Sequence, residues 1–465
     1  MAVGSVKYAS GVAGVVNRTL RRDAGFAAVS LLALAAPVLG WATVLPFLAI
    51  AGAAAFLIDE GPAFELFARP RDWQAGRLYG LAAFSLSAAV LAFLAAPPPF
   101  VTATYSMPLP AFAASVVTVG VGTLGATALR ERVDEEFLVI SAFAVAGFVA
   151  ALLAQLVVVA LGNSPVGVAS VEAIDLSTAT FHAALAALVG ALTRSLLSAD
   201  DRAAATFAVG ATMLVIGALS QSVHVLDVGL ALGVALFLGI VTYATGTASV
   251  EGMLSGVLLC LVTIVLGGPG WFALLLTFFG IGTLSTKFRF EVKAKRGVAE
   301  ENEGARGLGN VLGNAAIALL AVVGFAAAAD FPVDPDLFRV AFAGSLAAAM
   351  GDTLSSEIGG LFDNPRLVTT WKRVSPGTDG AVTWQGELAG LVGAAFVGVL
   401  SSMLLGISTP MPTLVAVVAV GGLAGMTADS LLGATVEGER IENETVNLLA
   451  TLAGALASVL LLLLA

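Results

Sequence analysis

Side chains that commonly bind metals or carry redox chemistry are scarce in this sequence. It contains one cysteine, Cys260, and two histidines, His182 and His224. A single cysteine excludes an internal disulfide and a thiolate metal site, and two widely separated histidines do not predict a zinc site. Charged residues make up only 12% of the chain, and the absence of Gly-Lys-Ser and Gly-Lys-Thr excludes a Walker A loop. Any nucleotide must therefore be bound by a different design.

Hydrophobic residues are abundant instead, at 58% of the 465 residues. A soluble protein of this size cannot bury that much apolar surface. The apolar residues form runs of about 17 to 25 residues, the length that a helix needs to cross a hydrocarbon core about 30 Å thick. The sequence therefore predicts an all-α, polytopic membrane helical bundle with about 15 transmembrane helices.

The predicted helices fall into two regions of the chain. Residues 1–225 form a predicted N-terminal membrane bundle of unknown role, with spans at Ala24–Leu39, Trp41–Ile58, Leu78–Ala95, Pro110–Leu129, Phe137–Leu161, Thr178–Leu196 and Ala203–Ser220. Residues 226–465 form a second predicted membrane domain, with spans at Leu226–Ala244, Gly252–Leu266, Pro269–Ser285, Leu308–Ala328, Leu337–Met350, Glu387–Ile407, Pro412–Leu432 and Val446–Leu464. The first two spans are divided only near Pro37 and Gly40.

Alternating these spans across the membrane places the basic loop residues on one face, which the positive-inside rule makes the cytoplasmic face. Only Arg339 falls on the opposite side. The N-terminus is predicted to be cytoplasmic, and no cleaved signal peptide is expected because about twenty residues precede the first apolar run. The net charge is −10 and the basic residues lie in short loops beside spans, so no nucleic-acid partner is predicted.

Three loops on this face carry most of the polar chemistry: Ser285–Gly307, Gly351–Gly386 and Asp429–Thr445. Asp352 and Asp429 each end an apolar run and are each followed by a hydroxyl residue and a leucine. Two carboxylates from different helices predict a Mg²⁺ site, because this ion takes one or two carboxylates and completes its shell with water and phosphate oxygens. The alternative is that each aspartate only marks the water-facing end of its span.

The segment from Lys372 to Gly380, KRVSPGTDG, predicts an anion site. It combines cations with a Pro-Gly turn, whose N–H groups can surround phosphate oxygens. The candidate ligands are Lys372, Arg373, Ser375, Gly377, Thr378, Asp379 and Gly380. Glu357 lies about 140° from Asp352 round a regular helix, so both can bind one ion only if the helix breaks. We predict Glu357 as a site residue, and Gly359 and Gly360 permit such a break.

A second anion site is predicted at Arg306, where RGLGNVLGN opens a span from the same face. Asn310 and Asn314 lie on one helical face and can point their amides at a ligand. Lys287 is a candidate for binding a lipid phosphate, although membrane anchoring explains it equally well. Asn447 can face the site from the last span. The rest of the charged run from Lys287 to Glu303 is interpreted as a solvated face.

In combination, these motifs resemble the phytyl-phosphate kinase family of integral membrane proteins, also called domain of unknown function 92. The resemblance covers roughly residues 226–465 and rests on GGPGWF, LSTKFR, ARGLGNVLGN, GDTLSSEIG, KRVSPGTDGAVTWQG, ADSLLGAT and ENETVN. It implies an enzyme that phosphorylates an isoprenoid monophosphate of the polyprenyl or phytyl type to its diphosphate, with a nucleoside triphosphate and CTP favoured. The site residues implied by the resemblance are Asp352, Glu357, Lys372, Thr378, Asp379 and Asp429.

The sequence therefore predicts a CTP- or ATP-dependent isoprenyl-phosphate kinase in the cell membrane, with its site loops in the cytoplasm. Mg²⁺ held by Asp352 and Asp429 would bridge the nucleotide phosphates. Lys372, Arg373 and the turn Gly377–Gly380 would stabilise the negative charge on the transferred phosphoryl group. Three alternatives stay open: a transporter of a charged or lipid-phosphate substrate, a CTP-dependent cytidylyltransferase, and a membrane scaffold without chemistry. Whether the chain forms a homo-oligomer also stays open.

Overall fold

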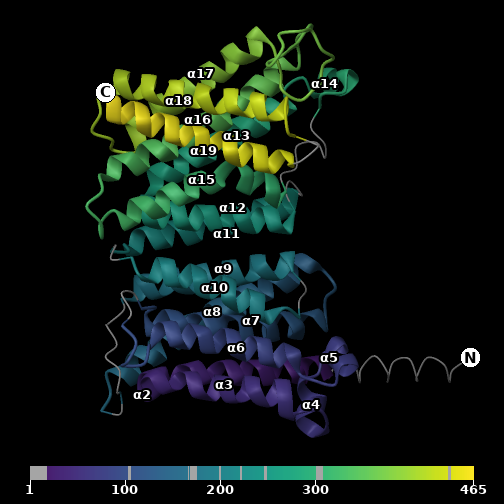
Figure 1. The fold of residues 1–465 in the computed structure, drawn as a ribbon, viewed down its shortest axis with the longest axis vertical. Coiled ribbons are helices and arrows are strands. Elements are labelled where there is room, and N and C mark those ends of the chain that lie inside the picture. Colours follow the sequence, from purple (N-terminus) through teal and green to yellow (C-terminus); the bar gives the residue numbers. More distant parts are fainter. Residues whose placement is uncertain are drawn as a thin grey trace, which may run out of the picture. The chain divides into compact units, whose positions relative to one another are not determined.

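The computed structural model describes residues 18–102, 106–165, 167, 175–197, 200–219, 222–245, 249–299, 307–437 and 441–465. The chain divides into two compact units, unit 1 at Met1–His224 and unit 2 at Val225–Ala465. Figure 1 shows that both units are helical. In the described residues the one sheet pairs two short strands, β1 (Arg366–Leu367) and β2 (Ala381–Val382). The predicted all-α membrane bundle is confirmed.

Unit 1 begins with a helical run, Arg18–Leu57, that includes α2 (Ala36–Leu39) and α3 (Val44–Gly52). Its other helices are α4 (Gly61–Phe67), α5 (Pro70–Ala75), α6 (Tyr79–Ala95), α7 (Leu109–Arg130), α8 (Glu136–Gly162), α9 (Leu176–Leu196) and α10 (Arg202–Gly217). The two spans predicted within this run are two arms of it that lie side by side, because Phe26 in the first arm packs edge-on against Phe67, just beyond the second arm, with ring centroids 5.4 Å apart. Pro37 lies in α2, which has a 3-10 turn on either side, and the chain turns back at Gly40, which has a φ of 55° and a ψ of −132°.

Unit 2 contains α11 (Val225–Thr245), α12 (Val250–Val262), α13 (Pro269–Lys287), α14 (Phe290–Arg296), α15 (Leu308–Ala327), α16 (Pro335–Gly359), α17 (Trp384–Leu404), α18 (Met411–Gly433) and α19 (Asn443–Leu464). Local sequence explains the ends of several of them. The Asp334 side chain accepts a hydrogen bond from the Asp336 N–H at the start of α16, and Pro335 fills the first turn. Thr383 caps α17 in the same way, through the Gly386 N–H at 3.2 Å.

Among the described residues, 12 helical segments are long and apolar enough to cross a membrane, and α6 and α10 are shorter apolar helices. Each predicted span overlaps one of these helices. The predicted count of about 15 is not confirmed, because two predicted spans correspond to the shorter helices and the run Arg18–Leu57, which turns back at Gly40, counts once among the 12.

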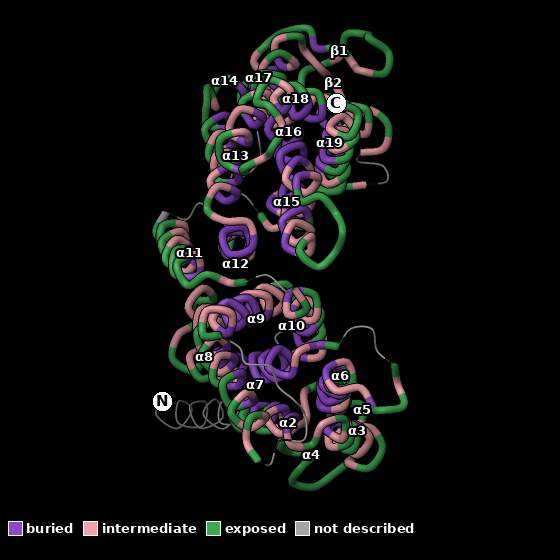
Figure 2. Tube along the Cα trace, turned by 90° about the vertical axis from the view of Figure 1, so that its left-hand side faces the viewer, coloured by how far each residue is buried: buried purple, intermediate pink, exposed green. Residues whose placement is uncertain are grey.

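Helix α16 is the central helix of unit 2. It contacts α13, α15, α17, α18 and α19, and every residue from Phe342 to Gly351 is buried, as the purple tube of α16 in Figure 2 shows. Glycines allow the close approach: a Cβ at Gly344 would lie 2.7 Å from the Gly454 carbonyl oxygen of α19. Helix α16 extends well beyond the predicted span Leu337–Met350, so Asp352 and Glu357 lie inside a continuous helix.

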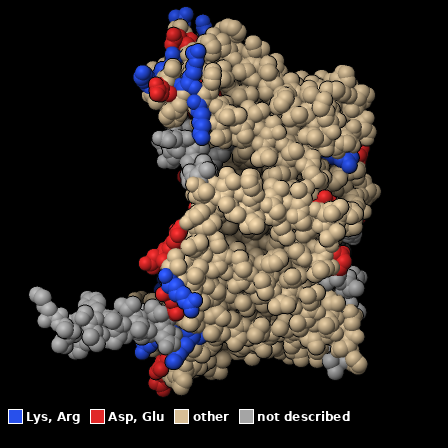
Figure 3. All heavy atoms as spheres, turned by 180° about the vertical axis from the view of Figure 1, so that it is seen from behind, with Lys and Arg blue, Asp and Glu red and all other residues tan. Residues whose placement is uncertain are grey.

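The loops that follow α13, α16 and α18 lie at one end of unit 2 (Figure 1). Figure 3 shows Lys, Arg, Asp and Glu side chains gathered at this end, which also carries α14 and the β1–β2 hairpin. The three predicted polar loops therefore share one face of unit 2. We call this face the loop end.

Candidate functional site

Asp352 and Asp429 come together at the loop end of unit 2. Asp352 lies in the last two turns of α16, and Asp429 lies in the last turn of α18. Both helices end at the same face, and the two carboxyl groups interact directly. Two adjacent carboxylates repel each other when both are ionised, so the arrangement favours a bound cation or a shared proton.

The surroundings of this pair are acidic. Glu387, in the first turn of α17, and Glu437, which follows α18, are close enough for their charges to act on Asp352. The Oδ1 atom of Asp429 is buried and has no hydrogen-bond partner in the described part of the chain. A buried carboxylate oxygen without a donor is costly, and a cation or a ligand hydroxyl would satisfy it.

The donor set fits Mg²⁺ better than zinc. Among the described residues, no group of three or more His, Cys, Asp or Glu side chains is arranged to hold a metal ion. Structural zinc sites need four protein ligands and catalytic ones three. Mg²⁺ is commonly held by one or two carboxylates together with water and substrate phosphate. Asp352 and Asp429 can provide those two carboxylates.

The hairpin loop packs against the end of α18. Leu367 pairs with Ala381 across β1 and β2, and the Leu367 N–H donates to the Lys372 carbonyl oxygen at 3.0 Å. Gly380 has a φ of 71°, and a Cβ there would overlap the Ser430 carbonyl oxygen. Only glycine permits both the left-handed conformation and this approach. The turn is therefore held next to Asp429.

Several N–H groups of this turn are available to a ligand. In the described residues, the backbone N–H groups of Gly377, Asp379 and Gly380 donate to no other group. The Thr378 hydroxyl donates to the Ser375 carbonyl oxygen at 2.8 Å, which closes the turn. Free N–H groups around left-handed glycines form concavities that bind anions.

Lys372 and Arg373 stand exposed on the same hairpin. Asp379, in contrast, lies near Glu437, whose environment is unfavourable for negative charge. Burial raises the pKa of the Glu437 carboxyl above its ordinary value, and the charges of Asp379, Asp429 and Glu444 raise this pKa further. Carboxylates of three loop-end segments thus converge beside the cationic hairpin.

Glu357 does not join the Asp352 pair, because α16 does not break between them. Its carboxylate forms a buried ion pair with Lys293 of α14 and accepts a hydrogen bond from the Thr286 hydroxyl at 2.8 Å. Lys293 also donates to the carbonyl oxygens of Ser285 and Thr286, at 3.0 and 2.7 Å. The interpretation of Lys287–Glu303 as a solvated face is wrong for Lys293, which is only 1% exposed.

The second predicted anion site is only partly described. Arg306 lies outside the described residues, and Lys287 is exposed in the last turn of α13. Asn314 is buried and donates its amide to the Asn310 carbonyl oxygen at 2.9 Å, so part of its donor capacity is used within α15. Asn447 is buried where α19 meets α15, and a Cβ at Gly313 would lie 3.4 Å from it.

A cavity of about 770 Å³ opens beside the aspartate pair. Glu387, Thr427 and Ser430 line it near Asp429, and two exposed tryptophans, Trp371 and Trp384, also line it. The volume falls in the usual range for small-molecule sites. Aromatic faces next to a polar pair suit a ligand with a flat ring and a charged group.

Comparison with known proteins identifies the family of this chain. The family described as integral membrane protein DUF92 matches residues 233–456, which contain every predicted site residue. An uncharacterized membrane protein of Methanocaldococcus jannaschii is 37% identical over 217 residues, covering 45% of this chain and 84% of the relative. The chain belongs to the DUF92 integral membrane family. The predicted resemblance to this family is confirmed.

Two plant relatives from Arabidopsis thaliana are also similar. The chloroplastic protein VTE6 is 32% identical over 222 residues, covering 46% of this chain and 65% of VTE6. Protein PGR is 32% identical over 215 residues, covering 42% of this chain and 74% of PGR. No solved structure matches this chain.

Sequence reasoning missed two partners at the loop end, Lys293 and Glu387. Lys293 lies in a run of alternating charges that resembles any solvated helix, and its partner Glu357 is far away in sequence. Glu387 stands at the first turn of α17, where an acidic residue is already explained by the helix dipole. Neither position carries a local signal that distinguishes it from a surface charge.

Proposed function

We propose that unit 2 is a Mg²⁺-dependent kinase that transfers a phosphoryl group from a nucleoside triphosphate, CTP in preference to ATP, to an isoprenoid monophosphate. The observation that carries this proposal is the meeting of Asp352 and Asp429 beside a cationic, glycine-containing hairpin. Phosphoryl transfer needs mainly positioning and charge neutralisation, and these are the features that the loop end offers. The family resemblance supports the same activity.

In this proposal Asp352 and Asp429 hold Mg²⁺, which supplies positive charge to the nucleotide phosphates. Lys372 and Arg373 donate charge-assisted hydrogen bonds to phosphate oxygens. The N–H groups of Gly377, Asp379 and Gly380 add fixed dipoles without reorganisation. An isoprenyl phosphate is already ionised at neutral pH, so no residue has to act as a strong base toward it.

Both substrates have a plausible place at the loop end. The 770 Å³ cavity, with Trp371 and Trp384 in its lining, suits a nucleoside whose phosphates extend toward Ser430 and Asp429. The isoprenoid chain is apolar and belongs among the membrane helices, with its phosphate at their ends. Because Asp352 lies inside α16 and not beyond it, the reacting phosphates would meet close to the membrane boundary.

The test uses the purified full chain in nanodiscs with labelled CTP or ATP, Mg²⁺ and a panel of isoprenyl monophosphates. We expect formation of a labelled diphosphate, and a loss of at least a hundredfold in Asp352→Asn and Asp429→Asn, about 2.7 kcal/mol of transition-state stabilisation. The matched control is Asp330→Asn, an exposed aspartate at the opposite end of unit 2, which should leave the rate unchanged.

Absence of any Asp352-dependent diphosphate with every donor and acceptor would refute the kinase. Release of pyrophosphate with a cytidylylated lipid would assign a cytidylyltransferase instead. Flux of labelled substrate into sealed vesicles, without product, would assign a transporter.

A further inference from the structure

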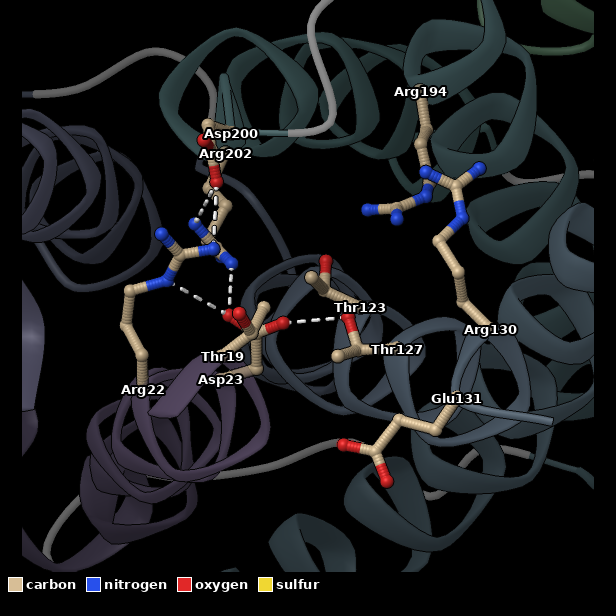
Figure 4. A pocket seen from close by; sticks show the side chains of 10 residues that line it. All are labelled: Thr19, Arg22, Asp23, Thr123, Thr127, Arg130, Glu131, Arg194, Asp200 and Arg202. Atoms are coloured by element: carbon tan, nitrogen blue, oxygen red, sulfur yellow. Dashed lines mark hydrogen bonds and ion pairs between the residues drawn. The ribbon is translucent and has the colours of Figure 1, made fainter. Parts of the chain in front are cut away.

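Unit 1 contains a cavity that the proposed kinase does not use. Its volume is about 310 Å³, and it lies among the ends of α7 and α9, the start of α10 and the start of the run Arg18–Leu57. Figure 4 shows the side chains that line it. The charged ones that matter here are Arg22, Asp23, Arg130, Arg194, Asp200 and Arg202.

A buried aspartate holds one wall of the cavity together. Asp23 is 1% exposed, accepts a hydrogen bond from the Thr127 hydroxyl at 2.6 Å, and forms ion pairs with Arg22 and Arg202. These contacts join three helices that are distant in sequence. The wall is therefore a built feature of unit 1 and not a chance meeting of surface side chains.

Arg202 is the residue whose donors are not all used. It is 3% exposed, and the Phe26 ring lies 4.3 Å from its guanidinium carbon. In the described residues its Nε and Nη1 atoms have no hydrogen-bond partner, although Nη1 lies 3.7 Å from Asp200. A buried guanidinium normally satisfies its donors, because a buried charged donor without a partner loses its hydration and gains nothing in return.

The opposite wall presents two further cations. Figure 4 shows the guanidinium groups of Arg130 and Arg194 beside each other, across the cavity from Asp23. Arg130 is exposed and forms no ion pair or hydrogen bond with a described residue. The lining holds four arginines and three carboxylates, those of Asp23, Asp200 and Glu131, which leaves an excess of positive charge. Like charges held this close favour an anion between them.

We propose that this cavity binds a phosphate group, supplied either by a lipid headgroup or by free phosphate. Guanidinium groups match phosphate oxygens by paired, charge-assisted hydrogen bonds. A volume of about 310 Å³ lies at the lower limit for ligand cavities and accommodates a phosphate with a small substituent. Basic pockets between membrane helices at the headgroup level are characteristic sites for anionic lipids.

The test uses the full chain in two arms. In the first, labelled orthophosphate is titrated onto protein in nanodiscs of phosphatidylcholine alone. In the second, native mass spectrometry measures retention of phosphatidic acid after transfer from mixed lipid into detergent. Both arms compare the wild type with Arg130→Gln and with the double variant R130Q/R194Q. The matched control is Arg132→Gln, which removes an exposed arginine next to α7 but outside the cavity lining.

We expect Arg130→Gln to weaken binding about tenfold and the double variant about a hundredfold, while Arg132→Gln changes it less than twofold. Binding of orthophosphate identifies a soluble source, and selective retention of phosphatidic acid identifies a lipid source. Failure of both ligands to bind, or equal losses in Arg130→Gln and Arg132→Gln, would overturn the proposal. Because Arg130 is exposed and forms no ion pair or hydrogen bond with a described residue, its replacement should leave the melting temperature unchanged, which distinguishes lost binding from unfolding.

The two proposals are tested separately. Phosphate sites at the loop end of unit 2 remain intact in these arginine variants, so any background binding there is the same in all of them. Conversely, failure of the kinase assay would not alter the difference between Arg130→Gln and Arg132→Gln.

Discussion

Replacing Glu357 with alanine is expected to destabilise unit 2 by about 3–5 kcal/mol, because it leaves a buried ammonium group without its counter-charge. Lys293 is 1% exposed and keeps only two neutral acceptors after this change, the carbonyl oxygens of Ser285 and Thr286. The Thr286 hydroxyl also loses its acceptor. Both lost interactions lie where α13 and α14 meet α16. We therefore expect the whole of unit 2 to be destabilised, and not only the ends of these helices.

The double variant Lys293→Met/Glu357→Leu distinguishes the cost of leaving one buried charge unpaired from the cost of changing the packing of the side chains. Removing both charges replaces the pair with apolar groups of similar volume, which is often neutral for stability. We therefore expect the double variant to be more stable than Glu357→Leu alone, with a coupling energy of at least about 2 kcal/mol between Lys293→Met and Glu357→Leu. The control pair is Arg296 and Asp363, whose carboxylate is 80% exposed, and its removal should cost less than about 1 kcal/mol.

The measurement is equilibrium unfolding of the full chain in mixed micelles, followed by far-ultraviolet circular dichroism. Additive effects of the two single changes, within about 0.5 kcal/mol, would refute the claim that Lys293 and Glu357 depend on each other. Activity of the double variant gives a second result. If stability returns while the diphosphate product is lost, Glu357 also acts on the substrate.

Three further expectations concern the loop end. Gly380→Ala should destabilise the hairpin more than Gly377→Ala. Both glycines have a positive φ, but only at Gly380 would an added Cβ lie closer than 3 Å to backbone atoms. Thermal unfolding of the two variants measures the difference. Glu437→Gln should raise the melting temperature at pH 8 and lose this advantage as the pH falls below the ordinary pKa of 4.5. The sign follows from the raised pKa, since the folded state binds the Glu437 proton more tightly than the unfolded state, so ionisation costs stability as the pH rises. Mg²⁺ should raise the melting temperature of the wild type but not of Asp429→Asn, and an equal rise in both would contradict the assigned metal ligands.

The predicted membrane class and most helices could be read from the sequence because hydropathy is a local, additive property. Each apolar run, such as Pro110–Leu129, crosses the hydrocarbon by its own length and composition, whatever its neighbours are. Alternation of the spans then places the loops after α13, α16 and α18 on one face. The sequence thus predicted which polar segments meet, including the approach of Asp352 to Asp429.

The ends of helices and the partners of single charges needed the tertiary structure. Helix α16 continues past Met350 because its polar last turns are buried by neighbouring helices, and no hydropathy window can show that. Continuation of the helix then separates Glu357 from Asp352 and pairs it with Lys293. Coulomb energy in a buried site depends on distance and desolvation, not on spacing along the chain.

The arginine-lined cavity of unit 1 shows most clearly which features the sequence predicts and which depend on the tertiary structure. From the sequence, Arg130, Arg194 and Arg202 are three basic residues beside three spans, as the positive-inside rule expects of any membrane protein. Folding places Arg202 against Asp23 and sets Arg130 and Arg194 across the same cavity, and it leaves donors of Arg202 without a partner among the described residues. The sequence by itself determined that these charges lie at the membrane boundary, and only helix packing decided that they face one another.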